Sequence, residues 1–276
     1  LQEVDIPDWQ GLKHSEIQDK SPTLLQAFHE SPGKFEIYSD GELRRPLFDL
    51  YQRVCGFMGE RISRSKSRIL VVSHLGTSQA LINVALGLTE SNHHCIQQSQ
   101  CAVSRLEFRA TGNAELTRLN DTGHLGQPLP KIKSQKNGVR VIFLGFADRA
   151  NLQGLDFSIL NAEEDSVWIE NGLDAEGLAL PLKPAVFSIG IDGLDKSLAE
   201  RIKQLRMHGN HVSTLLIATR SASLTKIAES LFGIPQALMA SVHNSTEFSM
   251  VVHDSTEQAR PIVQLLNNSI AGFLKQ

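Results

Sequence analysis

The run Ile69-Leu70-Val71-Val72, followed by Ser73-His74-Leu75-Gly76-Thr77, decides the expected fold. Four consecutive apolar residues without polar alternation are typical of a strand that is buried on both faces of a parallel sheet. The segment Ser78 to Leu86 then predicts a helix, which Gly87 ends. A buried strand, a turn and a helix in this order favour α/β domains, each with helices packed on a mainly parallel sheet in three α/β/α layers.

Length and composition narrow the class of protein. The chain has 276 residues, which suits about two domains of roughly 100–200 residues each. Its 41% hydrophobic and 21% charged residues exclude a disordered tail, a collagen-like fibre and a disulfide-stapled miniprotein. The net charge of −3 gives no general attraction to nucleic acid or to an anionic membrane, and no apolar run approaches the roughly 18 residues of a membrane span. Three cysteines favour a reducing compartment, so we expect a cytoplasmic protein.

A composition change near the middle of the chain predicts a domain boundary. Residues 126–138 contain two prolines, two glycines and three lysines with one isoleucine, which cannot bury much surface. Further strands are expected over 101–108 and 115–119 before this stretch and over 139–144 after it. We therefore expect a domain over 1–130, a linker over 131–138 and a second domain over 139–276.

The second half repeats part of the first. Leu70–His74 aligns with Leu216–Arg220 at an offset of 146, and Gly87 aligns with Gly233 at the same offset. Residues 116–122 (LTRLNDT) resemble residues 263–269 (VQLLNNS) at an offset of 147. This order predicts a tandem duplication, although any two βαβ units share some of these features.

The turn at His74 is the first candidate functional site. Ligands of open α/β sheets gather at the carboxyl ends of the strands, and the helix that follows presents unpaired N–H groups to an anion. A histidine at this place can contact a bound phosphate and, when it is protonated, stabilise the phosphate charge. A histidine that only supports the local structure is the alternative.

Three blocks of the first domain, in order, resemble the histidine phosphatase superfamily, the phosphoglycerate mutase-like proteins. Leu1 to Leu12 (LQEVDIPDWQGL) resembles the family block L-x-E-x-x-x-G-x-W-x-G, and Leu70–His74 resembles its second histidine motif. Residues 119–125 (LNDTGHL) resemble the Leu-Asn-x-Thr-x-His-Leu ending of many members. Residues 1–130 are thus similar to the C-terminal half of the family domain. The tandem arrangement, with Gly-x-Pro-Leu-Pro between the copies, is similar to two-domain cyanobacterial members.

The resemblance implies phosphoryl transfer through a phosphohistidine, without metal or other cofactor. In the family, an Arg-His-Gly motif supplies the nucleophile, and arginines and a second histidine bind the phosphoryl oxygens. Carried over, His74 is the second histidine, and Glu3 is the general acid and base. Ser73 and Gly76, on the same turn, are expected to contact the substrate phosphate. Leu75 departs from the glycine that often follows this histidine.

The Arg-His-Gly motif occurs nowhere in the 276 residues. The resemblance places it upstream of Leu1, so we expect an N-terminally truncated first domain and an inactive fragment. Where the second half should carry the motif it reads Gly145-Phe146-Ala147, and the counterpart of His74 is Arg220. We therefore expect residues 139–276 to form a degenerate, noncatalytic copy, in which Arg220 packs or lies on the surface rather than binding an anion.

The expected activity is hydrolysis or transfer of a phosphoryl group on a small phosphorylated metabolite. The alternative is a noncatalytic protein of the same fold that binds a phosphorylated ligand. The sequence does not distinguish a mutase from a phosphatase, and it leaves the oligomeric state open. Two stretches with reactive or basic side chains, His93-His94-Cys95 with Cys101 and Ser63–Arg68, are interpreted as loops, because no Cys-x2-Cys pairing supports a metal site.

Overall fold

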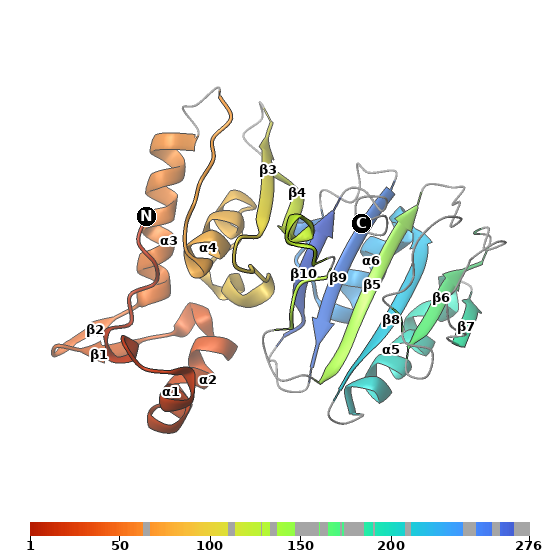
Figure 1. The fold of residues 1–276 in the computed structure, drawn as a ribbon, viewed down its shortest axis with the longest axis horizontal. Coiled ribbons are helices and arrows are strands. Elements are labelled where there is room, and N and C mark those ends of the chain that lie inside the picture. Colours follow the sequence, from red (N-terminus) through yellow and green to blue (C-terminus); the bar gives the residue numbers. More distant parts are fainter. Residues whose placement is uncertain are drawn as a thin grey trace. The chain divides into compact units, whose positions relative to one another are not determined.

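The structure is a computed structural model, and it describes most of the chain (Figure 1). The described residues are 1–62, 67–109, 114–127, 129–132, 137–146, 160, 165–171, 173, 185–189, 191–207, 211–239, 247–255 and 260–267. They form two compact units. The first comprises Leu1–Gln100 and Leu106–Glu115, and the second comprises Cys101–Arg105 and Leu116–Gln276.

The first unit is mainly helical. Its helices are α1 (His14–Lys20), α2 (Pro22–Glu30), α3 (Pro46–Phe57) and α4 (Leu75–Ala85), and a π-helical turn over Met58–Ile62 extends α3. Strands β1 (Ile37–Ser39) and β2 (Glu42–Arg44) form a hairpin. Asp40 and Gly41 connect the two strands with positive φ angles of 55° and 81°, which the tight two-residue turn requires.

Helix α3 is central to the core of this unit. Leu47, Leu50, Tyr51 and Val54 follow the i, i+3, i+4, i+7 spacing, and all four are buried. The last three pack with Ala80 of α4, and partly buried Val4 joins the same cluster. The amino-terminal residues are therefore fixed against both α3 and α4.

The predicted strand at Ile69–Val72 is not formed, which corrects the sequence analysis. These residues lie in no strand, and their exposures alternate at 45%, 89%, 39% and 89%. A strand that is buried on both faces needs a neighbour on each side, and no described strand pairs with this segment. The helix that follows begins at Leu75 rather than at Ser78.

The chain contains a mixed sheet of eight strands in the order β3-β4-β10-β9-β5-β8-β6-β7, and most of its residues belong to the second unit (Figure 1). The strands are β3 (Val103–Phe108), β4 (Ala114–Asp121), β5 (Gly138–Phe146), β6 (Ser166–Glu170), β7 (Ala185–Ile189), β8 (Val212–Arg220), β9 (Glu247–Asp254) and β10 (Ile262–Asn267). Strands β5, β8, β6 and β7 are parallel to one another, whereas β9 is antiparallel to β5 and to β10, and β10 is antiparallel to β4. The fold is therefore α/β, as the sequence predicts.

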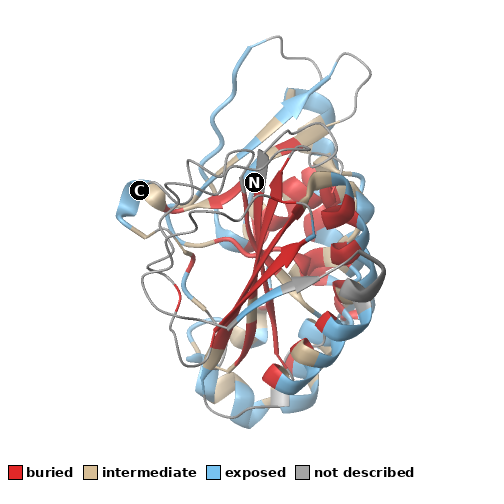
Figure 2. Cartoon of the chain, turned by 90° about the vertical axis from the view of Figure 1, so that its right-hand side faces the viewer, coloured by how far each residue is buried: buried red, intermediate tan, exposed pale blue. Residues whose placement is uncertain are grey.

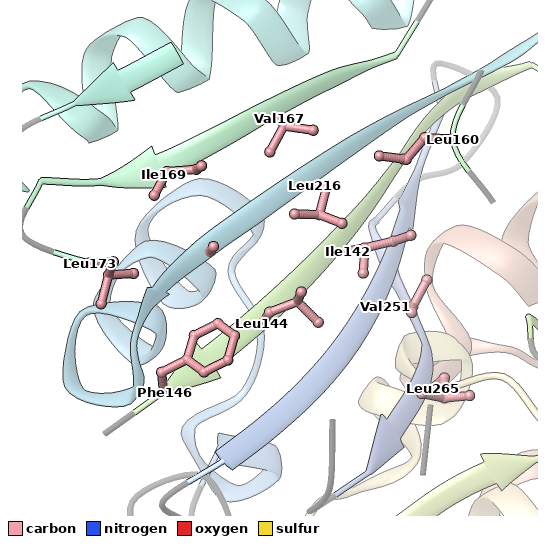
Figure 3. Close-up of a cluster of buried hydrophobic side chains, with 11 residues drawn as sticks. Ile142, Leu144, Phe146, Leu160, Val167, Ile169, Leu173, Leu216, Val251 and Leu265 are labelled. Carbon is pink, nitrogen blue, oxygen red and sulfur yellow. The ribbon is translucent and has the colours of Figure 1, made fainter. Parts of the chain in front are cut away.

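Helices flank this sheet. They are α5 (Ile191–Met207), α6 (Ser221–Phe232) and the short α7 (Gln236–Met239). Figure 2 shows that the buried residues concentrate in the central strands and that the helices turn exposed residues outward. Ile142, Leu144 and Phe146 of β5 pack with Leu216 of β8 and Val251 of β9 in the cluster that Figure 3 shows.

The two strand-to-helix turns that align in the sequence share local features. Helix α4 begins directly after His74 and α6 begins directly after Arg220. Gly87 and Gly233 follow these helices with positive φ angles of 74° and 58°. Strands β4 and β10 correspond to the two similar segments near residues 119 and 266. The tandem duplication and the boundary at 131–138 remain predictions.

Candidate functional site

The candidate site lies at the start of helix α4, within the first unit. His74 is the N-cap residue of α4, with extended backbone angles (φ −82°, ψ 169°), and its carbonyl accepts the N–H of Ser78 at 2.9 Å. Its side chain is exposed, and Ser73 is half-buried. Among the residues that the structure describes, no side chain pairs with the His74 imidazole.

The Glu3 carboxylate occupies the N-terminus of α4. Its Oε2 accepts the N–H of Gly76 at 2.9 Å, and its Oε1 accepts the N–H of Thr77 at 3.1 Å and that of Val4 at 2.8 Å. The N–H groups of Gly76 and Thr77 are the second and third of the helix, and they have no partner inside the helix. A carboxylate at this place also interacts favourably with the helix dipole. The structure thus brings Glu3 and His74 to one turn, although the sequence separates them by 71 positions.

Two neighbours hold the segment that carries Glu3. The Thr77 hydroxyl, which is fully buried, donates to the carbonyl of Gln2 at 2.9 Å and lies 3.4 Å from Glu3 Oε1. The Arg53 guanidinium of α3 donates to the Glu3 carbonyl at 3.3 Å. The sequence gives no signal for either residue, because a polar side chain at a helix start, such as Thr77, has several ordinary roles, and Arg53 lies 50 positions from Glu3.

Gly76 lies against the Glu3 side chain. A Cβ atom at this position would come within 2.6 Å of Glu3 Oε1, closer than non-bonded atoms approach. Gly76 is buried, and its N–H already binds Glu3. Its predicted contact with a substrate phosphate therefore remains a prediction, and the contact that the structure shows is with the carboxylate.

The stretch His93-His94-Cys95 does not form the loop that its sequence predicts. His93 and Cys95 are buried in a short 3-10 helix over Glu90–Cys95. The His94 ring packs on Phe28 at 4.7 Å, and its Nε2 lies 3.0 Å from the Phe28 carbonyl. Cys101 is exposed. Within the described ranges, no group of three or more His, Cys, Asp or Glu side chains is arranged to hold a metal ion.

Arg220, the counterpart of His74, has an internal partner. Its guanidinium pairs with the Glu170 carboxylate, which lies at the end of β6 and is 1% exposed. This agrees with a packed arginine. Ala147 lies outside the described residues, as do Ser63, Arg64, Ser65 and Lys66, so the structure does not describe most of the basic Ser63–Arg68 stretch.

The residues of the candidate site lie within a segment of the chain that matches a known protein family. Residues 1–122 match the histidine phosphatase superfamily (branch 1). This segment, fewer than half of the 276 residues, contains Glu3, Ser73, His74 and Gly76. Residues 1–122 of the chain are thus similar to this family.

Three curated proteins are similar to this chain, and each is named as a phosphatase. A probable 2-carboxy-D-arabinitol-1-phosphatase of Arabidopsis thaliana is 33% identical over 127 residues, which are 44% of this chain and 26% of that protein. A 2-carboxy-D-arabinitol-1-phosphatase of Triticum aestivum is 27% identical over 171 residues, 58% of this chain and 34% of that protein. Phosphoserine phosphatase 1 of Hydrogenobacter thermophilus is 30% identical over 126 residues, 45% of this chain and 57% of that protein.

The chain therefore spans between about a quarter and just over half of the length of these relatives. No solved structure gave a significant match. No helix of the described chain has the length and apolar character needed to cross a membrane.

Proposed function

We propose that the complete protein hydrolyses or transfers a phosphoryl group on a small phosphorylated metabolite through a phosphohistidine, and that Glu3 and His74 belong to its active site. The observation that carries the proposal is the meeting of these two residues at the start of α4. The family match over residues 1–122 and three relatives named as phosphatases support it.

The proposed roles follow from the positions of the two side chains. The exposed His74 imidazole is free to bind an equatorial oxygen of a phosphoryl group, because no described side chain occupies it. Glu3 acts as general acid and base, with its carboxylate held by Gly76 and Thr77. Ser73 precedes His74 on the same turn, and we propose that it contacts the same phosphate.

The nucleophilic histidine is proposed to lie outside these 276 residues, because the chain contains no Arg-His-Gly sequence. The exposed run Ile69–Val72 supports this proposal. All four of its apolar residues are exposed, by 39% to 89%, as expected of a strand segment without partner strands. An apolar strand that pairs beside this run would end next to His74, where a nucleophile is needed.

The second half is proposed to be a degenerate copy of the first, as in the two-domain cyanobacterial members. The pairing of β4 with β10 supports duplication. Leu119 and Leu266 are equivalent at the offset of 147, and they lie directly opposite each other in antiparallel register. Two copies of one strand that meet about a two-fold axis produce this arrangement. We further propose that the protein is cytoplasmic.

The substrate class is proposed to be small phosphate esters that also carry a carboxylate. The names of the relatives specify 2-carboxy-D-arabinitol-1-phosphate and phosphoserine, and both molecules contain a carboxyl group and a phosphate ester. A substrate panel should therefore compare phosphorylated acids with their neutral analogues.

The direct test is substitution of His74 in the complete protein. His74→Ala is expected to lower kcat/KM for phosphate-ester hydrolysis by about 100-fold or more, because one lost transition-state contact to a phosphoryl oxygen has that size of effect. His14→Ala, which changes an exposed histidine of α1, is the matched control and should leave the rate unchanged. Near-normal turnover of His74→Ala would contradict the assignment.

The absence of the nucleophile gives a second prediction. The 276-residue chain alone is expected to show no turnover of a generic aryl phosphate in a continuous colorimetric assay. Turnover that copurifies with the folded chain through successive columns would show that the nucleophile lies within these residues.

A noncatalytic phosphate-binding protein is the second candidate, and the missing Arg-His-Gly sequence favours it. The complete coding sequence distinguishes the two candidates. An Arg-His-Gly motif directly after an apolar strand indicates an enzyme, and its absence indicates a binding protein.

A further inference from the structure

The strand-to-helix turn of the second unit holds a buried carboxylate. Glu170 ends β6, and its neighbouring parallel strand β8 ends at Arg220, directly before α6. Glu170 is 1% exposed, and it lies 50 positions before Arg220 in the sequence. The carboxylate therefore reaches the turn through the pairing of the two strands.

Three different donors converge on this carboxylate. Glu170 Oε2 accepts the backbone N–H of Arg220 at 3.0 Å and the hydroxyl of Thr219, which is fully buried. Glu170 Oε1 accepts Nη1 of the Arg220 guanidinium. A buried charge is tolerated when it is paired and hydrogen-bonded in this way.

The donors are of the types that bind phosphate oxygens in proteins: a backbone N–H at a helix start, a hydroxyl and a guanidinium. In this turn both carboxylate oxygens already use them. An incoming anion would have to displace a buried carboxylate, which would then lose its partners in a site with little access to water.

We propose that the Glu170 carboxylate occupies the anion-binding donors of the turn at Arg220, so that the second unit binds no phosphate there. The two turns of the chain thereby differ in kind. In the first, Glu3 binds helix N–H groups and leaves the His74 side chain exposed for a ligand. In the second, the side chain at the equivalent position is itself the partner of the carboxylate. This inference holds whether or not the first unit is catalytic.

One feature favours the opposite interpretation and defines the test. The Arg220 side chain is 33% exposed, and the part of the chain that the structure describes offers it no partner besides Glu170. An exposed edge of the guanidinium could bind phosphate while Glu170 stays in place. Phosphate binding by the wild-type chain at Arg220 would therefore overturn the proposal.

The experiment is a titration of the 276-residue chain with inorganic phosphate, followed by NMR through the amide signals of Arg220 and Ser221 and the Arg220 Nε signal. In the wild-type chain these signals should not shift in a saturable way. Glu170→Gln keeps the shape of the side chain and removes its charge. In this variant the signals should shift in a saturable way, with an affinity for phosphate at least about tenfold higher than the upper limit for the wild-type chain. The double variant Glu170→Gln with Arg220→Gln should lose this gain.

Two controls keep the outcomes distinct. Glu200→Gln makes the same charge change on an exposed position of α5 and should leave the Arg220 signals silent. The amides of Gly76 and Thr77 report separately on the first turn, so a failure of the proposed function is seen at different signals. If Glu170→Gln folds by circular dichroism but gains no phosphate response, the proposal is wrong.

If Glu170→Gln does not fold, the wild-type chain and Arg220→Gln still decide. The two should show the same shift of Tm with added phosphate, because Glu170 occupies the donors of the native turn. A larger shift in the wild-type chain would mean that Arg220 binds phosphate with Glu170 in place, and the proposal would fall.

Discussion

At the residue scale, Gly76 shows how one missing side chain places a carboxylate. Gly76→Ala would put a Cβ atom 2.6 Å from Glu3 Oε1, so either the carboxylate or the start of α4 must move. We expect a loss of about 1–3 kcal/mol in the free energy of unfolding, the usual range for an added methyl in a filled site. Urea denaturation of the 276-residue chain measures this loss.

Gly56→Ala is the matched control for this substitution. Gly56 is an exposed residue of α3, and a Cβ atom there would contact nothing within 4 Å. Alanine is a better helix former than glycine, so this variant should gain about 0.5–1 kcal/mol. Equal effects of the two substitutions would show that Gly76 is not packed against Glu3.

Single residues also show where sequence reasoning ends. His74 could be selected because it follows an apolar run, and Glu3 because it stands in a recognisable block. Glu170 carried no comparable signal, since its partner Arg220 is 50 positions away and only strand pairing brings them together. The apolar trio Val167-Trp168-Ile169 before it could have indicated the end of a buried strand.

At the element scale, the short helix over Glu90–Cys95 packs three histidines of the first unit into one aromatic cluster. The ring of His94 lies 4.8 Å from that of His93 and 5.1 Å from that of His29 on α2. His93 Nδ1 lies 3.4 Å from the Tyr51 hydroxyl of α3, which accepts a hydrogen bond from Asn83 of α4. The cluster thus connects α2, α3 and α4 through this short helix.

This cluster predicts acid sensitivity. Burial lowers the pKa of His93 to about 4, and burial followed by the charges of His93 and His29 lowers the pKa of His94. Because the unfolded chain binds protons at a pKa of about 6.5, stability is full above that pH and falls as the pH drops toward 4. For His93 alone the loss is about 3 kcal/mol by pH 4.

Chemical denaturation between pH 7 and pH 5 measures this effect, since most carboxylates stay ionised there. The other titratable groups facing the cluster are His14, Glu30, Glu90, Cys95 and Tyr51. His93→Phe, which keeps an aromatic ring and cannot be protonated, should flatten the pH dependence. Replacement of the exposed His124, which lies outside the cluster, by alanine should leave the slope nearly unchanged. An unchanged slope in His93→Phe would contradict the prediction.

At the scale of the whole molecule, sequence patterns located several of the paired strands and failed at Ile69–Val72, which no described strand pairs with. The segments predicted over 101–108, 115–119 and 139–144 correspond to β3, β4 and β5. The run Ile69–Val72 has an equally apolar pattern but forms no strand. Hydrophobicity indicates which side chains would be buried in a sheet, and only partner strands supply the hydrogen bonds that form one.

This difference gives the last prediction, which compares equivalent positions in the two halves. Leu70 is 89% exposed, whereas Leu216 on β8, with which it aligns in the sequence, is 1% exposed. In the 276-residue chain, Leu70→Lys with Val72→Lys should change the free energy of unfolding by no more than about 0.5 kcal/mol, as for surface substitutions. Leu216→Lys should unfold the second unit or cost more than about 4 kcal/mol, because it buries an unpaired charge.

The same double substitution should behave differently in the longer protein that the proposed function requires. If a strand from outside these residues pairs with Ile69–Val72, both lysines enter a buried sheet, and we expect loss of the proposed phosphatase activity together with a lower Tm. Hydrogen exchange then reports the cause directly, since the amides of residues 69–72 should be protected in the complete wild-type protein and unprotected in the 276-residue chain. Equal, fast exchange of these amides in both proteins would show that no strand pairs there, and the nucleophile would have to approach His74 by another route.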